Sequence, residues 1–550
     1  MFIDDCTFTQ NGRTYRRVLL RNSYRVHGKV RHDILANLSH CSAQEIEALK
    51  LALKHKVRLS QMLEAGHTLT TKQGLAVGAV WVLHELARRL GLSKALGRSR
   101  QAKLALWLVV ATVIAPGSRL SAVRLAQRHA ACDILGLEAF NEDDLYGTLE
   151  WLDQHQAQIE GRLFAHRYGA CQPRLYLYDV TSSYFEGAQN ELAEYGYNRD
   201  GKKGKKQIVV GLLTDEEGWP IAVQVFVGNT PDATTLKPQI EKLARRFGVS
   251  EVTLVGDRGM IKSVQLQDLA NAHFHYITAI TKPQITTLLK RDILQLEGFT
   301  ADVAEVAAKE VRYLLRRNPQ RAEELAAKRQ QKLAQVRHVA QHHNTYLAQH
   351  PRAQVAAALN HVRAKAQHLR ISSWVEVKAE GRMVGVEVRE ERLAAESRLD
   401  GCYVLRTDLL PAEASAPLIH DRYKDLAQVE WAFRTMKTTL LELRPIYVRT
   451  AAHTRAHVFT IMLAYLLVYQ LAQLWQDVEV TLDEGLQELA SICALEVVTA
   501  GRVSHQTIPQ PRPLGQLLLA KTAITLPEAI PCRNVEVVTR KKLTAERKSH

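Results

Sequence analysis

The pattern of hydrophobic and polar residues divides the chain into segments of different character. Near the N-terminus, two β-prone runs joined by His27-Gly28 predict a small basic hairpin within residues 1–42. Apolar residues then recur at helical spacing over 43–172, which predicts an all-α region. After Pro173 the pattern changes to short apolar runs separated by turns and helices, which predicts an α/β domain with a mixed sheet.

A long basic segment separates this α/β region from the last strong helices of the chain. Residues 299–370 are rich in Ala, Gln, Lys and Arg and are predicted to be helical, and β-prone runs return before helices resume near His420. We therefore expect an insertion between two parts of one α/β core. The expected boundaries are 173–282 for the first part of the core, 283–416 for the insertion, 417–505 for the last core helices and 506–550 for a C-terminal tail. The end of this tail, RNVEVVTRKKLTAERKSH, is basic and is expected to be loose.

The charge of the chain suits a polyanionic partner. Lys and Arg number 73 against 57 Asp and Glu, which leaves a formal net charge of +16 at pH 7. Such a surplus suits nucleic acid or an anionic membrane surface, and charge alone does not choose between them. The most apolar helical run, residues 458–475, carries Gln470 and Gln473 and is predicted to be a core helix rather than a membrane span.

Cysteine usage and the N-terminal residues bear on the cellular compartment. The seven cysteines are scattered, with no C-x-x-C pair and no Cys/His cluster at zinc spacing, so we expect a reducing compartment and no structural zinc. The first ten residues, MFIDDCTFTQ, are acidic and lack the basic-then-apolar order of a signal peptide. A cytoplasmic protein is therefore expected.

Two aspartates occur at the ends of apolar runs that are predicted to be strands. Asp179 lies in RLYLYDVTSSYFEG, and Asp257 follows the apolar run in VTLVGDRGM. A buried carboxylate without a partner is costly, so each aspartate needs a compensating group. For each motif taken alone, a turn or cap role and a ligand role both remain open.

A third carboxylate, Glu430, lies on the predicted helix DRYKDLAQVEWAFRTMKTTLLELRP. Helical spacing places Tyr423, Glu430 and Lys437 on one stripe, and Arg434 joins them one turn after Glu430. For Glu430 alone, the alternative is an ordinary i,i+4 pair with Arg434 on a solvated helix. Together, two carboxylates at strand ends and one on a helix can hold a pair of Mg²⁺ ions, which take oxygen ligands and can clamp both oxygens of a phosphoryl transfer.

Five motifs, in their order along the chain, resemble the DDE transposases of bacterial insertion sequences, in the group whose glutamate lies in a Tyr…Arg…Glu…Lys helix. They are YDVTSSYFEG, GYNRDGKKGKKQIVVGLL, GNTPDATTL, VGDRGM and YKDLAQVEWAFRTMKTTLLELRPIYVRTAAHTRAHVFTIMLAYLL, and SYRVHGKVRHDILANL and APGSRLS extend the resemblance over nearly the whole chain. The resemblance implies an RNase H-like core with Asp179, Asp257 and Glu430 as catalytic acids. It also implies that these acids bind two Mg²⁺ ions, for which Mn²⁺ substitutes.

One position departs from the helix of this family group. The group places an arginine three residues after Tyr423, where this sequence has Leu426. Arg422 or Arg434 is the candidate replacement for the phosphate contact of that arginine. A hairpin intermediate at the cut DNA end, which would rely on the contact, is therefore not carried over.

The loop GYNRDGKKGKKQ carries four lysines close in sequence to Asp179. A charge run of this kind is usually a solvated loop, but beside a nuclease-like site it is expected to follow DNA phosphates without reading bases. The predicted DNA contacts are Lys202, Lys203, Lys205, Lys206, Arg258, Tyr423, Arg434 and Lys437. No G-x-x-x-x-G-K-[ST] motif occurs in the chain, so no nucleotide is expected.

The resemblance implies a transposase that binds the terminal inverted repeats of its own element, cuts by metal-activated water and joins the freed 3′-hydroxyl to target DNA. Region 43–172 is the expected DNA-end binding domain, a homodimer is expected when two ends are paired, and the DNA-bound protein would be associated with the bacterial nucleoid. A transposase-derived DNA-binding protein without catalysis is one alternative. A carboxylate-pair hydrolase such as a glycosidase is another, which the basic surplus disfavours.

Shared metal ions make a geometric demand on the fold. Asp179 and Asp257 should end neighbouring strands of one sheet, and the last core helix should turn Glu430 toward them. The insertion, 283–416, should lie outside this sheet.

Overall fold

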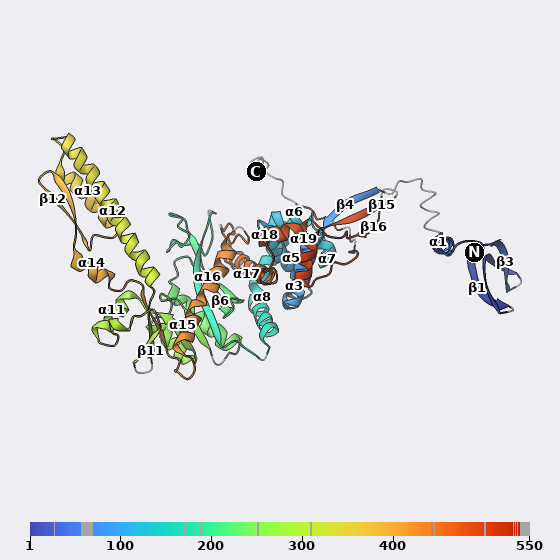
Figure 1. The fold of residues 1–550 in the computed structure, drawn as a ribbon, viewed down its shortest axis with the longest axis horizontal. Helices are drawn as coiled ribbons and strands as arrows, with labels where there is room; N and C mark the ends of the chain where they lie inside the picture. Colours follow the sequence, from blue (N-terminus) through green and yellow to red (C-terminus); the bar gives the residue numbers. More distant parts are fainter. Residues whose placement is uncertain are drawn as a thin grey trace. The chain divides into compact units, whose positions relative to one another are not determined.

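The computed structural model describes residues 1–56 and 70–539, except Asn11, His27, Ala170, Ala188, 250–251, 309–310, Thr439, Pro445, 500–501, Cys532, Asn534 and Glu536. The chain divides into two compact units (Figure 1). The first unit comprises Met1–Leu75, Cys493–Gln510 and Pro527–Cys532, and the second comprises Ala76–Ile492, Pro511–Leu526 and Arg533–His550.

The N-terminal part of the first unit is a three-stranded antiparallel sheet with one helix. Its elements are β1 (Phe2–Gln10), β2 (Arg13–Val26), β3 (Lys29–Asn37) and α1 (Ala43–Lys54). Val18, Leu19 and Ile46 are its buried apolar side chains. The pairing of β2 with β3 confirms the predicted hairpin, although His27 in its turn lies outside the described residues. Strand β1 was not predicted, and it pairs with β2 along its whole length.

A second sheet of the first unit joins segments that are far apart in the sequence. It has the order β16-β15-β4 and consists of β4 (Thr70–Ala76), β15 (Cys493–Thr499) and β16 (Arg502–Thr507). The prediction of helices throughout 43–172 and 417–505 was therefore wrong at these strands. Strand β4 pairs with a partner from the other end of the chain, and a local hydrophobic pattern carries no information about such pairing.

The helical part of the second unit packs around one long apolar helix. Its helices are α3 (Gly78–Arg89), α4 (Leu92–Leu96), α5 (Arg100–Ile114), α6 (Arg119–Ala126), α7 (Ala131–Leu135), α8 (Glu142–Tyr168), α17 (Ala451–Leu474) and α18 (Leu482–Ala490). Helix α17 contacts both α5 and α8. By length and composition α17 could cross a membrane, as could α5 and α6 if they formed one bent span, but 72% of the apolar window of α17 is buried inside the protein. The burial supports the predicted core helix.

The centre of the second unit is a mixed sheet of eight strands in the order β10-β11-β14-β9-β8-β5-β6-β7. Strands β5 (Leu175–Tyr184), β6 (Gln207–Asp215) and β7 (Pro220–Phe226) are antiparallel, whereas β8 (Thr253–Gly256) and β9 (His275–Ala279) run parallel to β5. The predicted α/β class with a mixed sheet is therefore confirmed. Helices α9 (Leu236–Glu241), α10 (Ser263–Asn271) and α11 (Lys282–Lys290) lie in the connections.

The predicted insertion, 283–416, does not lie wholly outside this sheet. Strands β10 (Ala304–Ala308), β11 (Val311–Arg317) and β14 (Cys402–Thr407) extend the sheet beyond β9. The prediction of helices from 299 was wrong here, because short apolar runs with flanking arginines suit a strand and a helix equally. The elements outside the sheet are α12 (Pro319–Gln349), α13 (Val355–His368), β12 (Val375–Glu380), β13 (Met383–Val388) and α14 (Glu390–Ser397).

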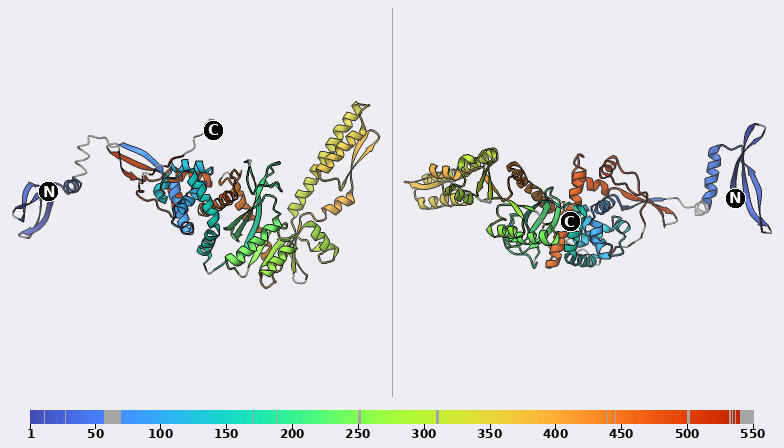
Figure 2. Two further views of the ribbon diagram at one scale, coloured as in Figure 1. Left: turned by 180° about the vertical axis from the view of Figure 1, so that it is seen from behind. Right: turned by 90° about the horizontal axis from the view of Figure 1, so that it is seen from below.

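Helices α12 and α13 lie side by side as a helical hairpin, with β12 and β13 next to them (Figures 1 and 2). Their shared core includes Leu333, Val336 and Trp374. The chain then returns to the sheet and continues into α15 (Ala416–Lys424) and α16 (Leu426–Lys437).

The predicted C-terminal tail, 506–550, contains a helix. Helix α19 (Pro513–Thr522) buries Leu518 and Leu519 and contacts α17 and α18. This helix was not predicted from the sequence. Residues 540–550, with most of the terminal basic run, lie outside the described residues.

Candidate active site

The two aspartates lie at the same edge of the sheet. Strands β5 and β8 are parallel neighbours, and Tyr178 is paired with Gly256. Asp179 and Asp257 are the next residues on the two strands, so they lie next to one another across the pair. The expectation that these aspartates end neighbouring strands is met for β8, whereas β5 continues to Tyr184.

The alternation of side chains along β5 decides which face Asp179 occupies. Tyr176, Tyr178 and Val180 belong to the apolar core that includes residues of α9 and α10. Because successive side chains point to opposite faces of a strand, Asp179 lies on the other face. Helix α16 contacts β5, and it carries Glu430.

Asp179, Asp257 and Glu430 line one cavity of about 310 Å³. Arg434 and Lys437 from α16 line the same cavity, together with Arg199, Asp232 and Gly259. The expected convergence of the three carboxylates is therefore observed. Among the described residues, however, no group of three or more His, Cys, Asp or Glu side chains is already close enough to hold a metal ion.

The negative charges of the three acids oppose one another in this cavity. Burial, together with the nearby carboxylates Asp257 and Glu430, raises the pKa of the Asp179 carboxyl to about 7, against opposing contributions from the Val180 backbone and Arg199. Three acids in one partly buried cavity resist holding three negative charges at once. The oxygen-only donor set of this cavity fits a hard cation such as Mg²⁺, which would neutralise these charges.

Two described groups of the chain donate hydrogen bonds to the Asp257 carboxylate. The Tyr423 hydroxyl donates a hydrogen bond to its Oδ1 at 3.3 Å, and the Arg258 backbone N–H donates to the same oxygen at 2.7 Å. Burial, then Asp257, raises the pKa of the Tyr423 hydroxyl, so this group remains a proton donor near neutral pH. Tyr423, predicted as a DNA contact, is thus also able to orient an acid of the site.

The predicted DNA contact Lys437 is engaged in a buried ion-pair cluster. Its Nζ lies 2.9 Å from Oδ1 of Asp200, and Nη1 of Arg444 lies 2.5 Å from the same oxygen. The Asp200 side chain is 2% exposed, and its Oδ2 accepts a hydrogen bond from the Tyr184 backbone N–H at 3.2 Å. Burial lowers the pKa of Lys437, and Asp200 opposes that change.

Sequence reasoning missed Asp200 and Arg444. The available signal was an isolated acid, Asp200, within the otherwise basic loop GYNRDGKKGKKQ. Arg199 and Asp232 of the cavity were also missed, and they pair with each other at 2.6 Å.

The four lysines of this loop are not equally available. Lys205 pairs with Glu186 at 2.6 Å, and Lys206 lies 3.5 Å from Glu194. Lys202 is exposed and lies over the Tyr184 ring, with Nζ 5.7 Å from its centroid. Lys203 is exposed and has no ion pair within the described part of the chain.

The position that departs from the family helix is buried. Leu426 begins α16 and is 8% exposed. Of its two candidate replacements, Arg434 lines the acid cavity, whereas Arg422 pairs with Glu216 at 2.6 Å. Arg434 is therefore the better placed arginine.

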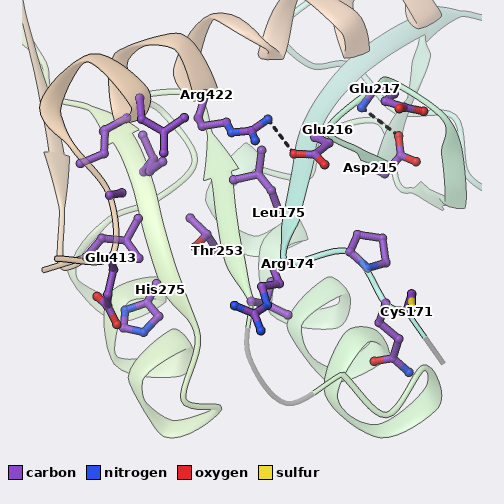
Figure 3. A pocket seen from close by; sticks show the side chains of 18 of the residues that line it. Cys171, Arg174, Leu175, Asp215, Glu216, Glu217, Thr253, His275, Glu413 and Arg422 are labelled. Carbon is purple, nitrogen blue, oxygen red and sulfur yellow. Dashed lines mark hydrogen bonds and ion pairs between the residues drawn. The ribbon is translucent and has the colours of Figure 1, made fainter. Parts of the chain in front are cut away.

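Arg422 instead faces a larger cavity, of about 1080 Å³, shown in Figure 3. This cavity includes Leu175, Thr253 and His275, which are the first residues of β5, β8 and β9. It therefore lies at the opposite strand ends from Asp257.

Comparisons with known proteins identify the family of the chain. The family described as "Transposase DDE domain" matches residues 170–467, which is more than half of the chain, and the "IS1634 family transposase, N-terminal domain" matches residues 5–65. No curated protein matches the chain.

Two solved structures are distantly similar. A cryo-EM structure of the piggyBac transposase synaptic complex with hairpin DNA is 8% identical in sequence and has a TM-score of 0.36. The match covers 77% of this chain and 82% of the chain in that structure. The Mos1 transposase paired-end complex with left transposon end is 13% identical, covers 26% of this chain and 52% of its own, and has a TM-score of 0.14. These low scores leave the assignment to the two family matches. On those matches, the chain belongs to the DDE transposases of insertion sequences.

Proposed function

We propose that this transposase binds the terminal inverted repeats of its own insertion sequence, cuts the DNA there and joins the freed 3′-hydroxyl to target DNA. The observation that carries the proposal is the convergence of Asp179, Asp257 and Glu430 on one cavity. A basic chain of net charge +16 supports a DNA substrate. The mixed sheet, with three antiparallel strands followed by two parallel ones, supports the proposal of an RNase H-like core.

In the proposed reaction, Asp179, Asp257 and Glu430 hold two divalent cations, Mg²⁺ or Mn²⁺. When bound, the two cations would activate the attacking oxygen and stabilise the leaving oxygen. In cleavage, a water oxygen forms a bond to phosphorus while the bond to the 3′-oxygen breaks, and the 3′-oxygen leaves as a hydroxyl after protonation. In strand transfer, the oxygen of that hydroxyl forms a bond to a target phosphorus while the bond from this phosphorus to the target 3′-oxygen breaks. The attacking hydroxyl loses its proton, and the leaving 3′-oxygen takes one up.

The residues around the acids have separate tasks in this scheme. Tyr423 holds the Asp257 carboxylate through its hydroxyl, and Arg434 is the cation of α16 that is available to a DNA phosphate. Lys437 acts through Asp200 and Arg444, because the buried ion pairs fix the loop that contains the basic run. Arg258 is exposed beside Asp257 and is a further proposed DNA contact.

The helical hairpin of α12 and α13 is a proposed surface for the DNA backbone. The sequence contains no Asp or Glu between Glu324 and Glu376. Arg329 is paired with Asp400, and Arg363 donates to the Val377 carbonyl oxygen. Six further cations of this segment have no ion pair within the described residues: Lys328, Lys332, Arg337, Arg352, Lys365 and Arg370.

This hairpin surface suits contacts that do not depend on base sequence. A 31-residue helix such as α12 is about 46 Å long, which is comparable to the length of about 14 base pairs. Recognition of the terminal repeats is assigned to the first unit and the helical region 43–172. We also propose a homodimer on paired ends, with the protein cytoplasmic and bound to the nucleoid through DNA.

The test is to incubate the protein with the DNA that flanks its own gene and Mg²⁺, and to map nicks to the nucleotide. Asp179→Asn, Asp257→Asn and Glu430→Gln should each abolish cleavage while DNA binding and folding persist. Asp268→Asn is the matched control, because Asp268 lies on α10 with only a 3.9 Å pair to Lys237. Retained DNA binding without any cleavage by the unmodified protein would instead favour a DNA-binding protein without catalysis.

A further inference from the structure

The turn Gly117-Ser118-Arg119, within the motif APGSRLS, has no role in the proposed chemistry. It begins α6, and the Ser118 hydroxyl caps the helix by accepting a hydrogen bond from the Ser121 N–H at 3.1 Å. Arg119 is the first residue of the helix, and its charged side chain is buried.

Arg119 is a buried cation without a matching anion. The residue is 7% exposed, and its Nε and Nη1 atoms are buried with no hydrogen-bond partner among the described residues. Its Nη2 donates to the Gly117 carbonyl oxygen at a long 3.3 Å, and no ion pair with Arg119 occurs within the described part of the chain. A buried guanidinium in this state destabilises the fold unless a ligand completes it.

A cavity of about 550 Å³ lies beside Arg119. Its polar lining includes Ser118, Tyr146, Arg444, Tyr447 and His457. Burial, and next the Arg119 charge, lower the pKa of the His457 imidazole to about 3, so this histidine is neutral and adds no cation.

Two carboxylates also line this cavity, Glu142 and Glu442. Glu142 lies in the first turn of α8, where the helix N-terminus stabilises a negative charge. Glu442 is exposed to solvent. Neither carboxylate is within ion-pair distance of Arg119 in the described structure.

The cavity is connected to the acid site through Arg444. This arginine lines the cavity and also pairs with Asp200, the partner of Lys437. Leu441, Tyr447 and Val448 of the cavity belong to the segment that follows α16, the helix that carries Glu430. Arg444 therefore links this cavity, through Asp200, to Lys437, which lines the acid cavity.

We propose that this cavity binds a phosphate group through the guanidinium of Arg119, with Arg444 as the second cation. A guanidinium presents several N–H donors in a fork that matches phosphate oxygens, and a helix N-terminus adds a favourable dipole. The inference rests on the proposed function for its ligand, which is a backbone phosphate of the element end. Inorganic phosphate shares this chemistry and is the other source.

The first measurement compares Arg119→Met with the unmodified protein. Methionine removes the unpaired charge, so the DNA-free variant should be at least as resistant to urea as the unmodified protein. Its affinity for element-end DNA should fall about 10-fold, and the slope of log affinity against log salt should decrease by about 0.9. Arg119→Lys keeps the charge but not the fork, and it should recover part of the affinity.

Arg124→Met is the matched control, because Arg124 lies on the same helix, is partly exposed, and does not line the cavity. It should change the affinity less than 2-fold. The unmodified protein is also unfolded with urea in inorganic phosphate and in chloride of equal ionic strength. If phosphate stabilises the unmodified protein more than chloride does, and this difference is absent in Arg119→Met, the result supports the site and identifies free phosphate as a ligand. Stabilisation by DNA alone would support a backbone phosphate.

Two results would overturn the inference. One is an Arg119→Met protein with unchanged DNA affinity and salt slope. The other is an Arg119→Met protein that is strongly destabilised, together with an Arg119→Lys protein of normal stability and unchanged DNA affinity. This pair of results would mean that the charge of Arg119 only stabilises the fold. Because these are binding and stability measurements, they remain decisive even if the protein cuts no DNA and the proposed catalysis fails.

Discussion

Replacing Asp200 by Asn tests the ion-pair cluster that links the basic loop to α16. Asn keeps the size of the side chain and an acceptor for the Tyr184 N–H, but it removes the charge that faces Lys437 and Arg444. The Lys437 side chain is 10% exposed, so its ammonium has little access to water. Arg444 is 34% exposed and can turn partly into solvent, so it contributes less than Lys437 to the expected loss of folding free energy.

The expected decrease in the free energy of unfolding follows from the cost of leaving a buried charge without a partner. Removing one member of a buried pair costs about 3–5 kcal/mol, and we expect the low end, about 3 kcal/mol, because Arg444 can be rehydrated. The double variant Asp200→Asn/Lys437→Met removes both charges and should recover most of this loss, since neutral replacement of both partners is often tolerated. Urea unfolding of the four proteins, without DNA, gives the coupling free energy as a double-mutant cycle.

The loss in Asp200→Asn should also depend on pH. Burial lowers the pKa of Lys437 even with Asp200 present, and removal of Asp200 lowers it further. A buried lysine with a depressed pKa destabilises the fold below the pKa of the unfolded state, so the loss should shrink as pH rises from 7 toward 10. A loss below about 1 kcal/mol at pH 7, or a double variant no more stable than Asp200→Asn, would refute this reasoning.

Three further outcomes are expected. Replacing Lys328, Lys332, Arg337 and Arg352 with Gln should weaken binding to any duplex and reduce the salt slope by about 0.9 for each DNA phosphate that is no longer neutralised, while Arg321→Gln should not, because Arg321 pairs with Glu324. Neutralising Lys202 and Lys203 should reduce the slope more than neutralising Lys205 and Lys206, which are paired with Glu186 and Glu194; equal reductions would show that these ion pairs open on DNA. Light scattering of the complex with paired ends should give two copies of the chain, and a single copy would exclude the proposed homodimer.

The acid cavity was more predictable from the sequence than the domain boundaries. Asp179 and Asp257 follow apolar runs that predict strands, and Glu430 shares one face of a predicted helix with Tyr423 and Lys437. Local patterns therefore place each acid on its element. The resemblance to transposases then identified them as one set. Parallel pairing of β5 with β8 brings the two aspartates together, and no local pattern specifies that pairing.

The errors lie where long-range pairing overrides local patterns. Strands β10, β11 and β14 join the sheet from within the predicted insertion, and β4 pairs with β15 from the other end of the chain. The partners of charged side chains were also invisible in the sequence. Lys437 was predicted as a DNA contact because of its place on the helix stripe, but Asp200 lies 237 residues away along the chain.

The central claim is that Asp179, Asp257 and Glu430 hold the catalytic metal ions of a DNA transposase. The most direct measurement is a crystal structure of the protein with element-end DNA and Mn²⁺, in which anomalous scattering locates the metal. We predict two peaks about 4 Å apart in the cavity, with oxygens of Asp179, Asp257 and Glu430 as ligands. Mn²⁺ bound elsewhere on the protein, with these three carboxylates free of metal in the DNA complex, would contradict the account.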